Sequence, residues 1–234
     1  MTSYQELEES FDKAFKEKEE YINQHGNEVY IKMSAVDYKG RPIIDPFNTH
    51  HVIIDLETFD TSSRAAVFAI GLVIVDPELK IIFKGEYILT DPFRAPMGDS
   101  RFASYKVSEP TVAWWLSEEQ VIANHYLEDR GTYESIRDML GDISHTIKQC
   151  PKDDFLVYGY PSDFDIPIIA NAYAKTRTPI AWKYHQSACL RTLKRLAYPS
   201  EEQLGKFDGI KHTPLADAYH EAKELIHILS HLKE

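Results

Sequence analysis

The chain has 234 residues, of which 43% are hydrophobic and 12% aromatic, and its formal net charge is −11 at pH 7. This composition excludes a disordered chain, and the negative charge argues against a protein that coats nucleic acid without specificity. Its two cysteines offer neither a disulfide framework nor zinc-ligand spacing, the N-terminus has no apolar signal segment, and no apolar run approaches the roughly 20 residues of a membrane helix. We therefore expect a soluble cytoplasmic protein, in the host cytoplasm if its source is viral.

The N-terminal part is predicted to be an extension. Residues 4–25 carry apolar side chains at helical spacing, which predicts an amphipathic helix that ends near Gly26. Turn residues around Lys39–Pro42 indicate a short hairpin or an extended linker. We assign residues 1–48 to this extension and residues 49–234 to the main domain.

The main domain has the pattern of an α/β fold. A strand is predicted at His51–Asp55, a buried strand within residues 64–76, a tight turn at 77–79 and an antiparallel partner strand at 80–89. One further strand is expected at 154–160. Helices are expected at 111–116, at 133–148, from about 162, at 190–197 and at 213–232. Three meandering strands followed by alternating helices and strands predict a layered fold with a mixed sheet.

Two acids follow the first predicted strand, in "HHVIIDLETFD". Side chains alternate along a strand, so Asp55 and Glu57 lie on one side, roughly 7 Å apart. A divalent cation would relieve their repulsion, because Mg²⁺ and Mn²⁺ prefer oxygen ligands. Taken alone, the pair equally fits a strand end that reaches solvent.

A second acidic pair lies in "YGYPSDFDIPII", where a buried strand gives way to a helix. This places Asp163 and Asp165 near the C-terminal edge of the sheet, where open α/β sheets form their sites. Ser162 and Asp165 also fit a capping box, which would give Asp165 a structural role.

The third segment is "KHTPLADAYHEAKEL". Thr213 is the predicted N-cap and Pro214 the first helical residue, so His212 precedes the helix and Asp217 lies about one turn into it. The helix dipole favours a carboxylate there, which again allows a structural explanation.

Together, the three segments place four carboxylates and one histidine at the ends of predicted elements. Four carboxylates can hold two divalent ions roughly 3.5–4 Å apart, an arrangement that hydrolyses phosphodiesters. A histidine can take the proton of the attacking water near neutral pH.

The motifs "IDLET", "FDIPII" and "HTPLADA" resemble the three motifs of the DEDDh family of 3′–5′ exonucleases, which has the ribonuclease H-like fold. In addition, "SSRAAVFAIGLVIVD" and "PTVAWWLSEEQ" are similar to the small phage exonuclease A and its bacterial exoribonuclease relatives, so the resemblance covers about residues 52–232. It implies an α/β fold with a mixed five-stranded sheet, the first three strands antiparallel, and flanking helices. Residues 49–234 would then form a 3′–5′ exonuclease domain.

The resemblance also implies roles for individual residues. The metal ligands for two Mg²⁺ or Mn²⁺ ions would be Asp55, Glu57, Asp165 and Asp217, and the general base would be His212. The family's Phe-Asp-x-Pro pattern selects Asp165 over Asp163, which makes Asp163 the expected helix cap.

Substrate contacts are predicted at two places. Thr58 and Phe59 follow the first motif, where relatives line the 3′-terminal nucleotide. The stretch 166–200 has no acid but several basic and aromatic residues, a combination that suits a single strand and equally suits a solvated helix surface. From it we select Arg191, Lys194 and Arg195. The adjacent Trp114 and Trp115 fit core or lid packing better than base stacking for both.

The sequence thus predicts an enzyme that releases nucleoside 5′-monophosphates from single-stranded 3′ ends. Two alternatives are a non-catalytic module that binds nucleic-acid ends and a phosphodiesterase for very short oligonucleotides. The choice between DNA and RNA depends on how the pocket treats the 2′-OH, and the oligomeric state stays open between a monomer and a homodimer.

Overall fold

The computed structural model describes residues 44–118, 121, 125–126, 131–151, 155–197 and 206–233. The predicted N-terminal helix and hairpin or linker fall almost wholly on residues 1–43, outside these ranges. Backbone contacts divide the chain into two units, Met1–Ile44 and Asp45–Glu234, and every element below belongs to the second.

A mixed five-stranded sheet forms the centre of this unit, with strand order β3-β2-β1-β4-β5. Strands β1 (His50–Thr58), β2 (Val67–Val75) and β3 (Ile81–Ile88) form an antiparallel meander, whereas β4 (Phe155–Gly159) and β5 (Ser187–Cys189) add parallel strands beside β1. The predicted α/β class and the antiparallel arrangement of the first three strands are confirmed.

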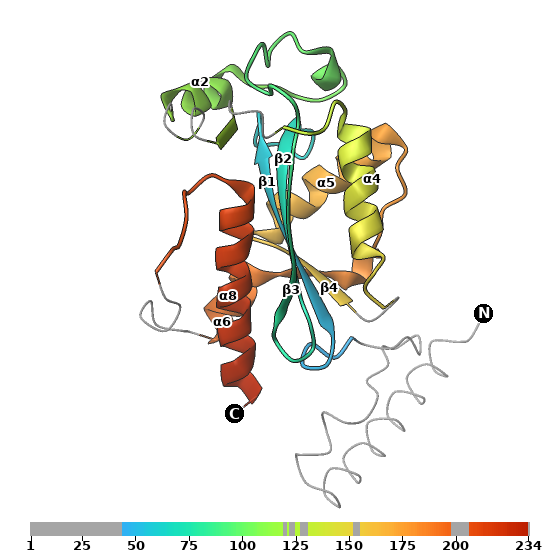
Figure 1. The fold of residues 1–234 in the computed structure, drawn as a ribbon, viewed down its shortest axis with the longest axis vertical. Helices are drawn as coiled ribbons and strands as arrows, with labels where there is room; N and C mark the ends of the chain where they lie inside the picture. Colours follow the sequence, from blue (N-terminus) through green and yellow to red (C-terminus); the bar gives the residue numbers. More distant parts are fainter. Residues whose placement is uncertain are drawn as a thin grey trace, which may run out of the picture. The chain divides into compact units, whose positions relative to one another are not determined.

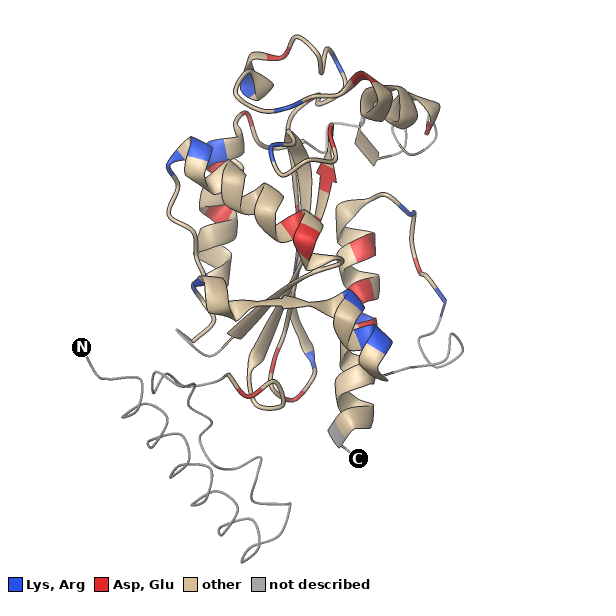
Figure 2. Cartoon of the chain, turned by 180° about the vertical axis from the view of Figure 1, so that it is seen from behind, with Lys and Arg blue, Asp and Glu red and all other residues tan. Residues whose placement is uncertain are grey.

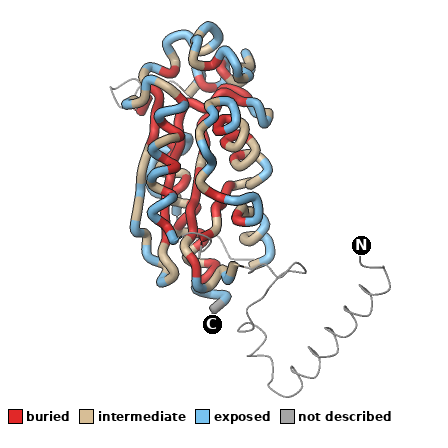
Figure 3. Tube along the Cα trace, turned by 90° about the vertical axis from the view of Figure 1, so that its right-hand side faces the viewer, coloured by how far each residue is buried: buried red, intermediate tan, exposed pale blue. Residues whose placement is uncertain are grey.

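Helices cover both faces of the sheet (Figure 1). One face packs against α8 (Pro214–Lys233), which lies beside α6 (Leu190–Ala197), and the other face packs against α4 (Ile136–Ile147) and α5 (Ser162–Thr176). Figure 3 shows the buried strands between these helices, and all nine residues of β2 are buried. Among the helices of the described residues, none is both long and apolar enough to cross a membrane.

The first strand is longer than its sequence predicts. We expected it to end at Asp55, but it continues to Thr58 and pairs with β2 along its length, with Asp55 opposite Gly71 and Glu57 opposite Ala69. The acids are tolerated inside the strand because the alternate residues, such as Leu56, still fill the apolar core on the other face. Asp55 and Glu57 share the side of Ile53, which packs with residues of α8.

A glycine lets α8 approach the sheet closely. A Cβ atom on Gly71 would lie 1.9 Å from the backbone oxygen of Pro214, the first residue of α8. We expect Gly71→Ala to lower the free energy of unfolding by about 1–3 kcal/mol, because α8 must shift away from the sheet. Gly141→Ala in α4 is the matched control: its Cβ meets no atom within 4 Å, so it should stabilise the fold by about 0.5–1 kcal/mol. Thermal melting of both variants measures these changes in stability. A Gly71→Ala variant as stable as the wild type would contradict the close approach of α8 to the sheet.

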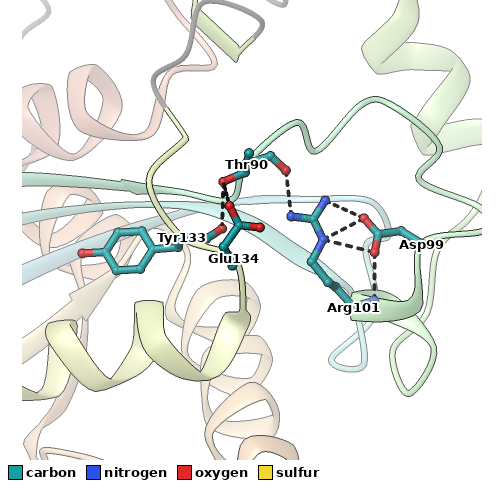
Figure 4. Close-up of polar contacts among 5 residues, drawn as sticks. All are labelled: Thr90, Asp99, Arg101, Tyr133 and Glu134. Atoms are coloured by element: carbon teal, nitrogen blue, oxygen red, sulfur yellow. Dashed lines mark hydrogen bonds and ion pairs between the residues drawn. The ribbon is translucent and has the colours of Figure 1, made fainter.

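The connection from β3 to α2 (Glu109–Ser117) is held by one arginine (Figure 4). The Arg101 guanidinium pairs with Asp99 at 2.6 Å and donates to the backbone oxygen of Thr90 at 2.7 Å. The Thr90 hydroxyl donates to Glu134 at 3.0 Å. These contacts fix the start of a long irregular segment whose later residues approach the candidate site.

Candidate active site

Three carboxylates converge where β1 meets the beginning of α8. Asp55 and Glu57 from β1 and Asp217 from the first turn of α8 each offer an oxygen, and these oxygens lie within 4.8 Å of one another. The strand alternation turns the first two toward α8, and the close approach at Gly71 brings α8 to them. Figure 2 shows acidic positions at the tip of β1, at the start of α5 and on α8 around one region.

Asp165 adds a fourth acid from the first turn of α5. It is 2% exposed, and its Oδ2 accepts the backbone N–H of Tyr160 at 2.9 Å. Its charge raises the pKa of both Asp55 and Glu57, so it belongs to the same cluster. Asp163, by contrast, is exposed to solvent.

The capping interpretations at α5 were wrong. The helix begins at Ser162 with Pro161 as its N-cap, and this N-cap forms no side-chain hydrogen bond. Asp163 therefore lies within the first turn and is not the cap, and Ser162 does not occupy the position that a capping box with Asp165 requires. Proline at the N-cap leaves the first turn to be satisfied by other groups.

The cluster carries more negative charge than its surroundings balance. Burial raises the pKa of Asp165 to about 7. Burial also raises the pKa values of Asp55, Glu57 and Asp217, and repulsion from neighbouring carboxylates adds to the effect for Asp55 and Glu57. Closely spaced carboxylates of this kind are the ligand set of hard divalent cations. The residues present therefore fit a divalent metal site.

His212 lies at the turn that precedes α8 and has an exposed side chain. Its backbone adopts the left-handed conformation, with φ of 63°, which histidine tolerates better than most residues. Two contacts hold this turn: the Asp217 carboxylate accepts the backbone N–H of His212, and the Tyr126 hydroxyl donates to the His212 carbonyl at 2.8 Å. The rings of Trp114 and His212 pack edge to face, with their centroids 5.0 Å apart.

A pocket of about 690 Å³ opens beside the cluster, large enough for a small organic ligand. Its lining comprises Leu56, Glu57, Thr58, Asp60, Thr61, Lys106, Ser108, Pro110, Thr111, Trp114, Trp115 and Phe164. Glu57 thus belongs to both the acidic cluster and the pocket. The tryptophan pair divides between two roles: Trp115 is buried and its indole donates to the Thr58 carbonyl at 3.0 Å, whereas Trp114 is 42% exposed.

The prediction for Phe59 needs correction. Its side chain is fully buried, and its ring stacks on Phe68 at 4.4 Å between centroids. The bulge between Glu57 and Thr58 changes the strand alternation at this point, so Thr58 lines the pocket while Phe59 enters the core.

Two pocket residues have no motif that predicts them. Lys106 and Ser108 come from the irregular segment before α2, which backbone hydrogen bonds attach to the chain after β1: Lys106 N–H donates to the Arg64 carbonyl at 2.8 Å, and Ser108 N–H to the Phe59 carbonyl at 2.8 Å. The Lys106 ammonium group lies 3.2 Å from the Asp60 carboxylate, and its side chain is 57% exposed.

The three predicted basic contacts on α6 have different surroundings. The Lys194 ammonium pairs with the buried Glu224 of α8 at 2.6 Å. The Arg191 guanidinium lies over the ring of Tyr160, and its central carbon is 5.0 Å from the ring centroid. The positive charge of Arg191 lowers the pKa of Asp165. Arg195 is exposed. Arg191 therefore lies near the acidic cluster and Arg195 faces solvent, whereas Lys194 already has a partner.

The model of one protein family matches most of the chain. It is described as the 3′–5′ exoribonuclease Rv2179c-like domain, and it matches residues 50–229. The chain belongs to this family. The description of this family agrees with the 3′–5′ exonuclease motifs that the sequence resembles. No curated protein matches the sequence.

Solved structures of DEDDh-type and other exonucleases share the fold of this family member. Exonuclease I in its apo form has 18% identity and a TM-score of 0.52 over 80% of this chain and 44% of its own. The nuclease domain of 3′hExo, a DEDDh family member bound to rAMP, has 12% identity and a TM-score of 0.52 over 84% of this chain and 95% of its own. The chain spans less than half the length of exonuclease I.

The raised pKa values predict how stability depends on pH in this family member. The carboxyl of Asp165 has a pKa of about 7 in the folded chain and about 3.9 in an unfolded chain. The folded state therefore binds more protons between these values, and stability falls as pH rises through them. We expect the melting temperature of EDTA-treated protein to drop by several °C from pH 5 to pH 8, since each kcal/mol shifts it by about 2–4 °C at this size. The slope should be smaller in Asp165→Asn, and an unchanged slope would contradict the assignment.

Proposed function

We propose that this chain is a divalent-metal-dependent 3′–5′ exonuclease that releases nucleoside 5′-monophosphates from single-stranded ends. The observation that carries the proposal is the position of Glu57, which contributes to the three-carboxylate group and also lines the pocket. A nucleotide seated in the pocket would therefore have its phosphodiester beside the acidic cluster.

The ligands proposed for two Mg²⁺ or Mn²⁺ ions are Asp55, Glu57, Asp165 and Asp217. When bound, such ions lower the pKa of water and offset the negative charge that develops on the phosphate. The chain's own contribution is to hold these carboxylates on three packed elements, so that little rearrangement is needed during the reaction.

The general base is proposed to be His212. Its exposed side chain can reach water, and imidazole accepts protons near neutral pH. The hydrogen bonds from its backbone N–H to Asp217 and from the Tyr126 hydroxyl to its carbonyl keep the residue next to the cluster. The exposed face of Trp114 suits stacking of the terminal base.

RNA is the substrate that we propose first, because the matching family is described as an exoribonuclease domain. Thr58, Ser108 and Thr111 are among the residues that line the pocket, and a side-chain hydroxyl can bond a 2′-OH. The DNA alternative is tested in the same experiment.

A time course on matched 5′-labelled RNA and DNA 20-mers tests the proposal. We expect a ladder that shortens one nucleotide at a time and a nucleoside 5′-monophosphate as product, with faster cleavage of RNA. Dinucleotides belong in the same series: a much higher rate on them than on 20-mers would indicate a phosphodiesterase for short oligonucleotides. Binding without any product in Mg²⁺ and Mn²⁺ would indicate a non-catalytic module.

Among the basic residues of α6, Arg191 and Arg195 should contribute to nucleic-acid binding, whereas Lys194 should contribute to stability. We expect Arg191→Ala and Arg195→Ala each to weaken binding of longer single strands and to reduce the salt slope by about 1. Lys194→Ala should instead lower the free energy of unfolding by about 1–3 kcal/mol, because it leaves the buried carboxylate of Glu224 with one partner fewer. Fluorescence anisotropy at several salt concentrations and thermal melting measure the two effects, and equal salt slopes in all variants would contradict the proposed contacts.

A further inference from the structure

Glu221 is a buried acid that the sequence motifs do not include. It lies one helical turn after Asp217 on α8, so the two side chains emerge from the same face. Glu221 is 8% exposed, and its Oε2 is inaccessible to solvent and has no hydrogen-bond partner among the described residues. A buried carboxylate oxygen without a hydrogen-bond partner is costly, so its presence requires an explanation.

The surroundings of Glu221 are those of the acidic cluster. Burial raises the pKa of Glu221 well above its usual range, and the carboxylates of Asp165, Asp217 and, more weakly, Glu224 raise it further. The charge of Glu221 in turn raises the pKa of Asp55. The positive charge of Arg191 lowers the pKa of Glu221. Arg191 belongs to α6, which packs beside α8 (Figure 2).

A second buried glutamate on the same helix shows the contrast. Glu224 is 4% exposed, but its Oε1 lies 2.6 Å from the Lys194 ammonium group and 3.3 Å from Nε2 of His220. Its burial is explained by these partners within the chain. Glu221 is buried to the same degree, and the groups that act on it most strongly are acids.

We propose that Glu221 is a fifth carboxylate of the metal site, whose charge increases the affinity of the acidic cluster for divalent cations. The inference rests on the proposed function, since it assigns Glu221 to the same ions. The five acids are Asp55, Glu57, Asp165, Asp217 and Glu221. Two divalent ions would balance four of these charges, and the guanidinium group of Arg191 would provide the remaining positive charge. Bound ions would thus add positive charge beside the Glu221 oxygen that has no hydrogen-bond partner among the described residues.

Titration of the full chain with Mn²⁺ by isothermal calorimetry, without nucleic acid, tests the inference. We expect Glu221→Gln to weaken Mn²⁺ binding by about 10- to 100-fold, the range seen when a supporting group of a metal site is removed. Glu224→Gln is the matched control, because it removes one carboxylate charge from the same helix at a residue that already has partners. We expect its Mn²⁺ affinity to stay within about threefold of the wild type.

Glu221→Asp separates charge from shape, and we expect it to bind Mn²⁺ more tightly than Glu221→Gln. Melting of the metal-free proteins gives a second readout: Glu221→Gln should match or exceed the wild type, because a repelling charge is removed, whereas Glu224→Gln should melt lower. Wild-type affinity in Glu221→Gln, equal losses in Glu221→Gln and Glu224→Gln, or equal losses in Glu221→Gln and Glu221→Asp would each overturn the inference. A wild-type chain that binds no Mn²⁺ would instead overturn the proposed function.

Discussion

Excess EDTA is expected to abolish nuclease activity, and Mg²⁺ or Mn²⁺ should restore it. Without cations, the cluster of Asp55, Glu57, Asp165 and Asp217 offers only acidic groups, and burial raises the pKa of each carboxyl. In that state the site cannot stabilise the additional negative charge of a phosphodiester under attack. Release of labelled mononucleotide should therefore fall by several orders of magnitude, to the level of a blank.

The control for this experiment is the state of the fold. Circular dichroism and melting should show that the EDTA-treated chain stays folded, because the two apolar cores that hold the sheet and helices together contain none of the clustered acids. Loss of activity would then report on the site alone. Hydrolysis that continues in excess chelator would exclude the two-metal mechanism.

Asp165→Asn should reduce turnover by about two orders of magnitude or more. The substitution preserves volume but removes one charge from the proposed ligand set. Metal-free stability should hold or rise above pH 7, because a buried carboxyl with a pKa of about 7 no longer has to ionise. Initial rates at saturating Mg²⁺ and melting temperatures in EDTA measure both effects.

Asp163→Asn is the matched control, two residues earlier on the same helix. Asp163 is exposed and does not cap α5, so we expect nearly full activity and a stability change within about 0.5 kcal/mol. An inactive Asp163→Asn beside an active Asp165→Asn would show that the second motif has been aligned two residues out of register.

The sequence predicts the parts of this fold that have strong patterns. Buried runs such as β2 and amphipathic segments such as α4 lie where their periodicity places them. Strand β5 has three half-buried residues, Ser187–Cys189, and it is a strand only because it pairs with β4. No local pattern indicates such a strand. The end of β1 was misplaced for a similar reason, since pairing with β2 extends it beyond Asp55.

Some residues of the candidate site can likewise be predicted from the sequence, and others cannot. Motif residues such as Asp55 and Asp217 are marked by spacing and by the helix start, and the structure brings them together. Lys106 reaches the pocket through backbone pairing with a segment some forty residues earlier in the chain, and Glu221 looks like any polar residue of a long helix. Only the folded chain shows what distinguishes Glu221 from the equally polar Glu224: both are buried, but Oε2 of Glu221 has no hydrogen-bond partner among the described residues, whereas Glu224 pairs with Lys194.

Arg101 anchors the segment that contributes to the pocket wall from a position outside the pocket. One guanidinium group joins the irregular segment to the backbone oxygen of Thr90 and to Asp99, while Lys106 and Ser108, farther along that segment, form part of the pocket wall. Arg101 itself lies outside the lining. A substitution at Arg101 would therefore loosen this tether of the pocket wall and leave every carboxylate of the acidic cluster unchanged.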